Sequence, residues 1–131
     1  MIGYATIGTN DLARSKAFFA PIAEILGHAQ MFETDRVFTW GTPGTGAMFG
    51  VITPFDEQPA TGGNGTMIGL LAEAEEQVDR IYEHALANGG SDEGPPGLRG
   101  EQFYGAYFRD PEGNKLVAYV FKVPEDGDGE A

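Results

Sequence analysis

Hydrophobic and polar positions alternate over residues 1–8 and again over residues 65–72, as they do in half-buried β-strands. Each segment precedes a stretch in which apolar residues recur at three- to four-residue spacing, which is typical of an amphipathic helix. This pattern predicts helices over residues 11–26 and 73–88. Glycines that directly follow both stretches are expected to end the helices.

Shorter strand-like segments follow each predicted helix. Further strands are expected at residues 28–33, 36–41, 47–53, 102–109 and 115–123. The last two should form a hairpin around the turn Asp110-Pro111-Glu112-Gly113-Asn114, with Asp110 capping the turn and Arg109 serving it. Residues 91–100 are rich in Gly and Pro, and we expect a loop there with at most a short strand.

Two residues set expectations for the first helix. Asn10 directly precedes it and is a good N-cap, because its side-chain oxygen can accept a bond from a free backbone N–H. Pro21 lies inside the helix and lacks a backbone N–H. A kink or local break is therefore expected near residues 17–21.

The two halves of the chain repeat. A shift of 63 residues places Tyr4 on Met67, and a shift of 68 places Phe49 on Val117. We therefore predict one domain over residues 1–123, of the α+β class, built from two tandem βαβββ modules at 1–61 and 62–123. Residues 54–64 are the expected linker. Residues 124–131 form an acidic, Gly-rich tail that is expected to be disordered.

Strand alternation sorts the side chains of each module between a helix-covered face and a concave face, and the two concave faces are expected to form a cup. The candidate ligand-binding residues on this cup are Tyr4, Thr6, Phe49, Met67, Tyr107, Val117 and Tyr119. They are mostly apolar and aromatic, with phenol and hydroxyl groups, which is the usual composition of a small-molecule site. Arg99 and Arg109 are cationic candidates near its rim.

Composition narrows the possible partners. The formal net charge of −12 repels phosphate backbones and disfavours nucleic acid as a partner. No apolar run approaches the roughly 20 residues that cross a bilayer, so no membrane partner is expected. The chain has no Cys, which excludes disulfides and thiolate chemistry. A cytoplasmic protein is the resulting expectation.

Three motifs carry a resemblance to a known family. They are Ile7-Gly8-Thr9-Asn10-Asp11-Leu12, Gly63-Asn64-Gly65-Thr66 and Tyr107-Phe108-Arg109-Asp110-Pro111-Glu112-Gly113-Asn114. In this order, and with the internal repeat, the chain resembles the vicinal oxygen chelate superfamily over about residues 1–122. That superfamily includes glyoxalase I, bleomycin- and fosfomycin-resistance proteins and extradiol dioxygenases. The resemblance implies the glyoxalase/bleomycin resistance/dihydroxybiphenyl dioxygenase fold and a homodimer. It leaves open whether the modules pair within one chain or across a swapped dimer.

The resemblance also identifies where a metal site would lie. Metal-dependent members place His or Glu at positions that correspond here to Tyr4, Phe49, Met67 and Val117. None of these is an ordinary ligand for a hard or borderline divalent ion. The two histidines, His28 and His84, have no partner at ligand spacing and are expected on the surface. We therefore expect no metal and no other cofactor.

Three functions remain open from the sequence. The first is a glyoxalase/bleomycin-resistance-like protein that lacks the metal ligands and binds a small aromatic or amphipathic molecule in the cup. The second is a lyase-like or dioxygenase-like enzyme with a relocated or non-metal site, in which Tyr4 or Tyr107 could act as a general acid. The third is a structural or interaction protein whose cup is filled by its own side chains. The sequence identifies no catalytic residue.

Overall fold

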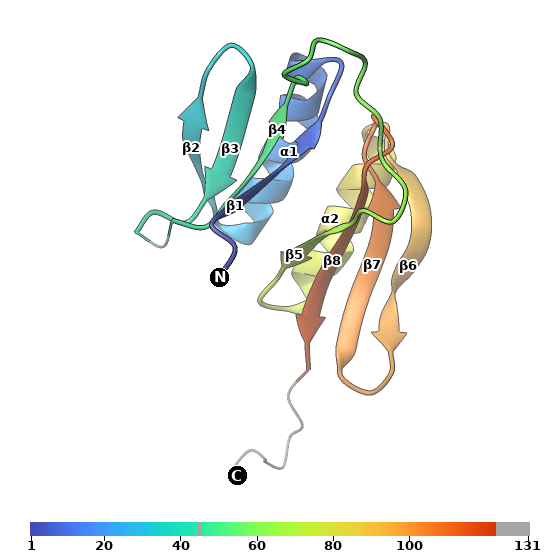
Figure 1. The fold of residues 1–131 in the computed structure, drawn as a ribbon. Coiled ribbons are helices and arrows are strands. Elements are labelled where there is room, and N and C mark those ends of the chain that lie inside the picture. Colours follow the sequence, from blue (N-terminus) through green and yellow to red (C-terminus); the bar gives the residue numbers. More distant parts are fainter. Residues whose placement is uncertain (45, 123–131) are drawn as a thin grey trace.

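The computed structural model describes residues 1–44 and 46–122, and these form two βαβββ modules (Figure 1). The first module contains β1 (Tyr4–Gly8), α1 (Leu12–Leu26), β2 (Ala29–Glu33), β3 (Val37–Gly41) and β4 (Met48–Ile52). The second contains β5 (Ile68–Leu71), α2 (Glu75–Ala87), β6 (Ser91–Arg99), β7 (Phe103–Arg109) and β8 (Lys115–Phe121). The α+β class and the tandem modules predicted from the repeat are confirmed. The acidic tail expected at 124–131 lies outside the described residues.

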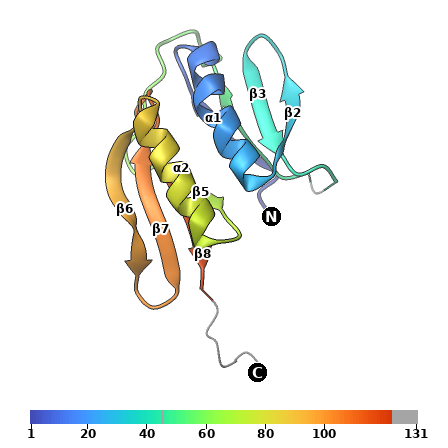
Figure 2. The same cartoon turned by 180° about the vertical axis from the view of Figure 1, so that it is seen from behind.

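Each module folds one mixed four-stranded sheet. The strand orders are β1-β4-β3-β2 and β5-β8-β7-β6, with β1 parallel to β4 and β5 parallel to β8. Both helices lie behind the sheets in Figure 1 and in front of them in Figure 2. The uncovered faces of the two sheets therefore point to the same side of the molecule, and we call this side the open face. Within the described residues the sheets stay separate, which leaves β1 and β5 as edge strands.

The core lies between the helices and the sheets. Phe18, Phe19 and Ile22 of α1 are buried, as are Val78 and Ile81 of α2. Each such side chain contributes about 1.5–3 kcal/mol by leaving water. The apolar spacing that predicted both helices thus marks the faces that they bury.

His84 joins the two helices. Its Nε2 lies 2.8 Å from the carbonyl oxygen of Phe18 and donates to it, because a carbonyl can only accept. Its Nδ1 lies 3.1 Å from the side-chain amide of Asn88, which makes Nδ1 the acceptor. The prediction of a surface histidine is wrong for His84, because α1 packs directly over this side of α2.

The start and the middle of α1 both differ from expectation. Asp11 is the N-cap, and its carboxylate accepts a bond from the backbone N–H of Arg14. Asn10 instead exchanges bonds with the backbone of Ala60, in the linker. The helix also continues through Pro21 without a break, since packing of the buried face on both sides of the proline holds it.

The turn between β7 and β8 is built as predicted. The Oδ1 atom of Asp110 accepts bonds from the backbone N–H groups of Glu112 and Asn114, at 3.0 and 2.8 Å. Arg109 donates to the carbonyl of Gly113. Asp110 is 3% exposed, and this burial raises its pKa above the ordinary value, although the bonds from Asn114 and Glu112 oppose the rise.

The same turn reaches across to the first module through a group that we call the Glu112 clasp, made of Thr9, Asn10, Arg14 and Glu112. The Glu112 carboxylate accepts bonds from Arg14 at 2.6 Å, from the backbone and side-chain N–H groups of Asn10 at 2.8 and 2.9 Å, and from Thr9 at 3.1 Å. Burial alone would raise the pKa of Glu112, but the bonds from Asn10, Thr9 and Arg14 lower it below the ordinary value. Two motifs that carried the family resemblance therefore meet in space.

The segment expected to be a loop is strand β6, nine residues long. It lies at the edge of its sheet, where Pro95 and Pro96 are tolerated because one side of an edge strand has no sheet partner. Its register with β7 shifts on both sides of Gly94. The prediction of a loop with at most a short strand was wrong because prolines exclude a central strand but not an edge strand.

Candidate functional site

Three aromatic rings gather on the open face of the second sheet. The rings of Phe103 and Tyr119 stack with centroids 5.2 Å apart and an interplanar angle of 11°. Phe121 meets both of them edge-on, at 5.6 Å. Two glycines make room beneath the rings: a Cβ on Gly105 would lie 2.7 Å from the Phe103 ring, and one on Gly69 would lie 3.2 Å from the Tyr119 ring. We call Phe103, Tyr119 and Phe121 the aromatic cluster.

Val117 lies in the same sheet, beside this cluster. It is 3% exposed, and a Cβ added to Gly69 or Gly105 would lie 3.6 or 3.3 Å from its methyl groups. Its neighbours Leu116 and Ala118 belong instead to the core beneath the helices. The alternation predicted for β8 is therefore correct, and the side chain that β8 presents here is an isopropyl group.

Tyr107 pairs with Val117 across β7 and β8, and two cations flank its ring. The Arg99 guanidinium lies 5.2 Å from the ring centroid, and the Lys115 ammonium lies 5.6 Å from it. Arg99 is held in place because it donates to the carbonyls of Gly97 and Gly105, at 2.9 and 2.6 Å. The open face of the second module thus combines aromatic rings with positive charge.

The first sheet contributes Tyr4 and Thr6, which are both exposed on the open face. Their partners on β4 are Met48 and Gly50. Phe49 points the other way. Its ring lies 5.2 Å from Phe19 and 6.4 Å from Trp40, between β4 and α1.

The prediction that placed Phe49 in the cup is therefore wrong. It aligned the repeat one residue off in this strand, and a shift of one residue assigns every side chain of a strand to the opposite face of the sheet. The pairing register gives the reason. In the first module Thr6 pairs with Gly50. The residue equivalent to Thr6 in the second module is Gly69, which pairs with Val117. Gly50 is therefore the equivalent of Val117, and the repeat shift between these strands is 67 residues. A Cβ on Gly50 would lie 2.6 Å from both the carbonyl oxygen of Phe38 and Cγ2 of Thr39, so no side chain fits there unless β3 moves.

The predicted residues thus divide into groups. Tyr107, Val117 and Tyr119 lie together on β7 and β8, and Met67 directly precedes the neighbouring strand β5. Tyr4 and Thr6 lie on the separate first sheet.

These residues do not fit a divalent metal. The positions that correspond to metal ligands hold the phenol of Tyr4, the thioether of Met67 and the isopropyl group of Val117. The fourth position is Gly50, where no side chain fits. Residues 1–44 and 46–122 contain no group of three His, Cys, Asp or Glu side chains that could hold a metal ion.

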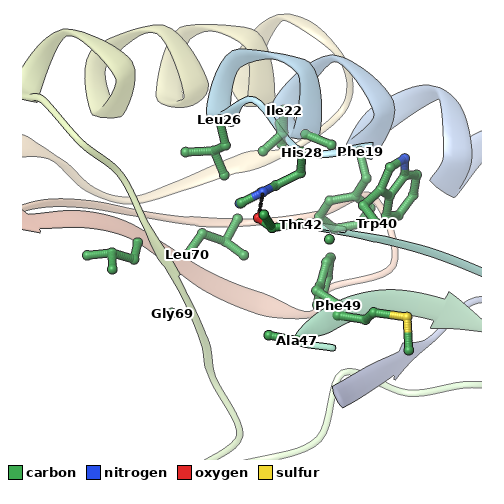
Figure 3. Close-up of a pocket in the computed structure, with 14 residues that line it drawn as sticks. Phe19, Ile22, Leu26, His28, Trp40, Thr42, Ala47, Phe49, Gly69 and Leu70 are labelled. Atoms are coloured by element: carbon green, nitrogen blue, oxygen red, sulfur yellow. Dashed lines mark hydrogen bonds between the residues drawn. The ribbon is translucent and has the colours of Figure 1, made fainter. Parts of the chain in front are cut away.

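A cavity of about 270 Å³ lies between the modules, and the sequence did not reveal it (Figure 3). Its wall consists of Phe19, Ile22, Ala23, Leu26, His28, Trp40, Gly41, Thr42, Ala47, Met48, Phe49, Gly69, Leu70 and Leu71. Of the predicted site residues only Phe49 belongs to this wall. His28 stands at the cavity with Nδ1 3.0 Å from the Thr42 hydroxyl oxygen, so it is not the isolated surface histidine expected. No sequence pattern could locate a space that depends on how two modules pack.

The arrangement of paired βαβββ modules agrees with the comparisons. The family model described as "Glyoxalase/Bleomycin resistance protein/Dioxygenase superfamily" matches residues 1–118. The chain belongs to this superfamily.

Solved structures support the assignment. A glyoxalase/bleomycin resistance protein from Albidiferax ferrireducens is 38% identical, with a TM-score of 0.84 over 92% of this chain and 98% of that one. A family enzyme from Burkholderia phytofirmans is 19% identical, with a TM-score of 0.70 over 91% and 97% of the two chains. A lactoylglutathione lyase from Agrobacterium tumefaciens is 18% identical, with a TM-score of 0.63 over 92% of each chain. The last two show the fold alone. No curated protein matches the chain.

Proposed function

We propose that this chain is a metal-independent binding protein that holds a small aromatic or amphipathic molecule on the open face of its second sheet. The observation that carries the proposal is Val117. By the family resemblance it corresponds to a position where metal-dependent members place His or Glu, and it lies beside the stacked rings of Phe103 and Tyr119. An apolar side chain among aromatic rings favours an apolar ligand over a hydrated cation.

The positive charges near the aromatic cluster indicate which kind of ligand would bind. Lys115 and Arg99 flank Tyr107, and neither forms a salt bridge within the described residues. The chain as a whole is strongly acidic, so two cations over one ring are a local exception. A ligand with an aromatic body and an acidic group would stack on the aromatic cluster and place its charge near these cations.

A second copy of the chain is the proposed macromolecular partner. Large apolar side chains are exposed on the open face and near the edge strands, including Tyr4 at 64%, Leu71 at 60% and Phe121 at 60%. Large apolar side chains that are exposed in such numbers favour an interface, provided that they adjoin one another in the assembly. A homodimer would also cover the unpaired edges of β1 and β5. In the part of the chain that the structure describes, no helix is long and apolar enough to cross a membrane.

The ligand proposal is tested by calorimetric titration with 2-naphthoate, which has a two-ring body and one carboxylate. We expect binding that Tyr119→Ala and Lys115→Gln each weaken by about tenfold. Lys16→Gln is the matched control, since Lys16 is a half-buried lysine of the first module that pairs with Glu33. Equal affinity in all four proteins would contradict the proposed site.

Two further measurements decide between the alternatives. Elemental analysis should find no stoichiometric zinc, nickel, iron or manganese in the purified protein, and a tightly bound equivalent would refute metal independence. Glyoxalase turnover, with and without added divalent metal, would favour the enzyme alternative. If Tyr4→Phe/Tyr107→Phe abolished that turnover, the phenols would be the acids of a non-metal site.

A further inference from the structure

The cavity between the modules differs in chemistry from the open face. We propose that it is a second binding site, which takes a small, neutral, planar apolar molecule with one hydrogen-bonding group. The wall is formed by the C-terminal half of α1, the end of β3, the start of β4 and strand β5, so both modules contribute (Figure 3). It is therefore a site that exists only when the two modules are packed together.

The size of the cavity fits such a molecule. The cavity is partly open to solvent, and even an enclosed apolar cavity of about 150 Å³ is enough for benzene. About 270 Å³ is available here. That volume has room for a substituted ring or for two fused rings.

The shape of the wall favours a flat ligand. Trp40 and Phe49 lie nearly parallel, with an interplanar angle of 23°, and Phe19 meets Phe49 edge-on. Figure 3 shows these three rings on one side of the cavity and Leu70 on the other. A planar ring between an aromatic wall and a leucine would gain contact on both of its faces.

The charge of the wall favours a neutral ligand. None of the described residues that line the cavity is Asp, Glu, Lys or Arg. A carboxylate or ammonium placed there would lose part of its hydration without gaining an ionic partner, which is unfavourable. The open face favours the opposite kind of ligand, because Arg99 and Lys115 could bind an acidic group there.

One polar group of the wall is available to orient the ligand. His28 uses Nδ1 in its contact with the Thr42 hydroxyl, at 3.0 Å. Its Nε2 has no protein partner within residues 1–44 and 46–122, and it donates or accepts according to the tautomer. A single carbonyl or hydroxyl on the ligand would form a hydrogen bond with Nε2 of His28.

The test uses Trp40 as a reporter, because it is the single tryptophan of the chain and lines the cavity. Acetophenone, a neutral ring with one carbonyl, is titrated while the indole N–H signal is followed by NMR. Benzoate serves as the charged counterpart of the same size. We expect a saturable shift with acetophenone. The affinity for benzoate should be weaker by a factor of at least about ten.

Variants assign the binding to this cavity. Ala23→Leu, which fills it from α1, should weaken acetophenone by about tenfold, and His28→Ala should weaken it severalfold. Phe121→Ala, on the open face and outside the wall of the cavity, should leave the affinity unchanged. If circular dichroism shows that Ala23→Leu is misfolded, His28→Ala and the benzoate comparison decide the question. The absence of a saturable shift, equal affinity for benzoate, or a loss of binding caused by Phe121→Ala would overturn the proposal.

Discussion

The Glu112 carboxylate accepts hydrogen bonds from both the backbone and the side-chain N–H groups of Asn10, which lies 102 residues earlier in the chain. These bonds hold the closing turn of the second module against the start of α1 in the first. Arg14 and Thr9 complete the partners of the same carboxylate, whose side chain is only 6% exposed. The clasp therefore fixes the module packing on which the cavity between the modules depends.

Glu112→Gln should destabilise the protein by about 2 kcal/mol, because it removes the charge from a carboxylate that is 6% exposed and accepts four hydrogen bonds. The measurement is the free energy of unfolding in urea at pH 7. Glu33→Gln is the matched control. Glu33 pairs with Lys16 at 3.3 Å on the surface, and its loss should cost less than about 1 kcal/mol. Equal losses in the two variants would show that the clasp contributes no more than a surface ion pair.

The contribution of Glu112 to the stability of the protein should depend on pH. The pKa of Glu112 is lowered in the folded protein, so its stabilising contribution is complete above the ordinary glutamate pKa of about 4.3. That contribution is lost as the pH falls through the lower folded value. The pKa of Asp110 is raised, which gives a contribution of opposite sign, but Asp110 is present in both proteins and its effect largely cancels.

The stability difference between the wild type and Glu112→Gln should therefore shrink as the pH falls from about 5 to about 3. Urea unfolding at several pH values across this range measures the difference. A difference that stayed constant or grew toward low pH would contradict the lowered pKa of Glu112.

Local sequence signals predicted most of the fold, and the errors have physical causes. Periodicity located both helices because their buried faces recur at helical spacing, as Phe18, Phe19 and Ile22 do. Asn10 and Asp11 are both good caps, and only the clasp decides that Asn10 serves Glu112 while Asp11 caps α1. Such a choice depends on a residue a hundred positions away, so no local pattern contains it.

Gly50→Ala tests the register that corrected the predicted cup. The added methyl group would meet the backbone of Phe38 and the side chain of Thr39 at 2.6 Å, so β3 and β4 must separate. We expect a loss of about 2 kcal/mol or more in urea unfolding. Gly3→Ala is the matched control, since a Cβ there meets nothing within 4 Å. An unchanged stability for Gly50→Ala would mean that the two strands are less closely packed than described.

The site was less predictable than the fold. Alternation was right for Val117 and Tyr119 because β8 is a regular strand that pairs on both sides. It failed for Phe49, because an aromatic residue suits either face of a strand and the glycine that follows it gives no signal of direction. The cavity between the modules was not predictable, since its wall joins His28 and Leu70 from different modules.

A designed metal site provides the last prediction. Val117→Glu with Tyr4→His and Met67→His places one carboxylate and two imidazole groups at three of the positions that correspond to ligands in metal-dependent members, and this triple variant should gain affinity for zinc or nickel. Calorimetric titration measures the gain against the wild type. The matched control replaces Val117→Glu by Phe49→Glu, because Phe49 packs against Phe19 and Trp40 on the helix side. The control should gain less affinity and lose stability, since it buries an unpaired carboxylate. If the control bound metal as tightly as the triple variant, the assignment of Val117 to the open face would be wrong.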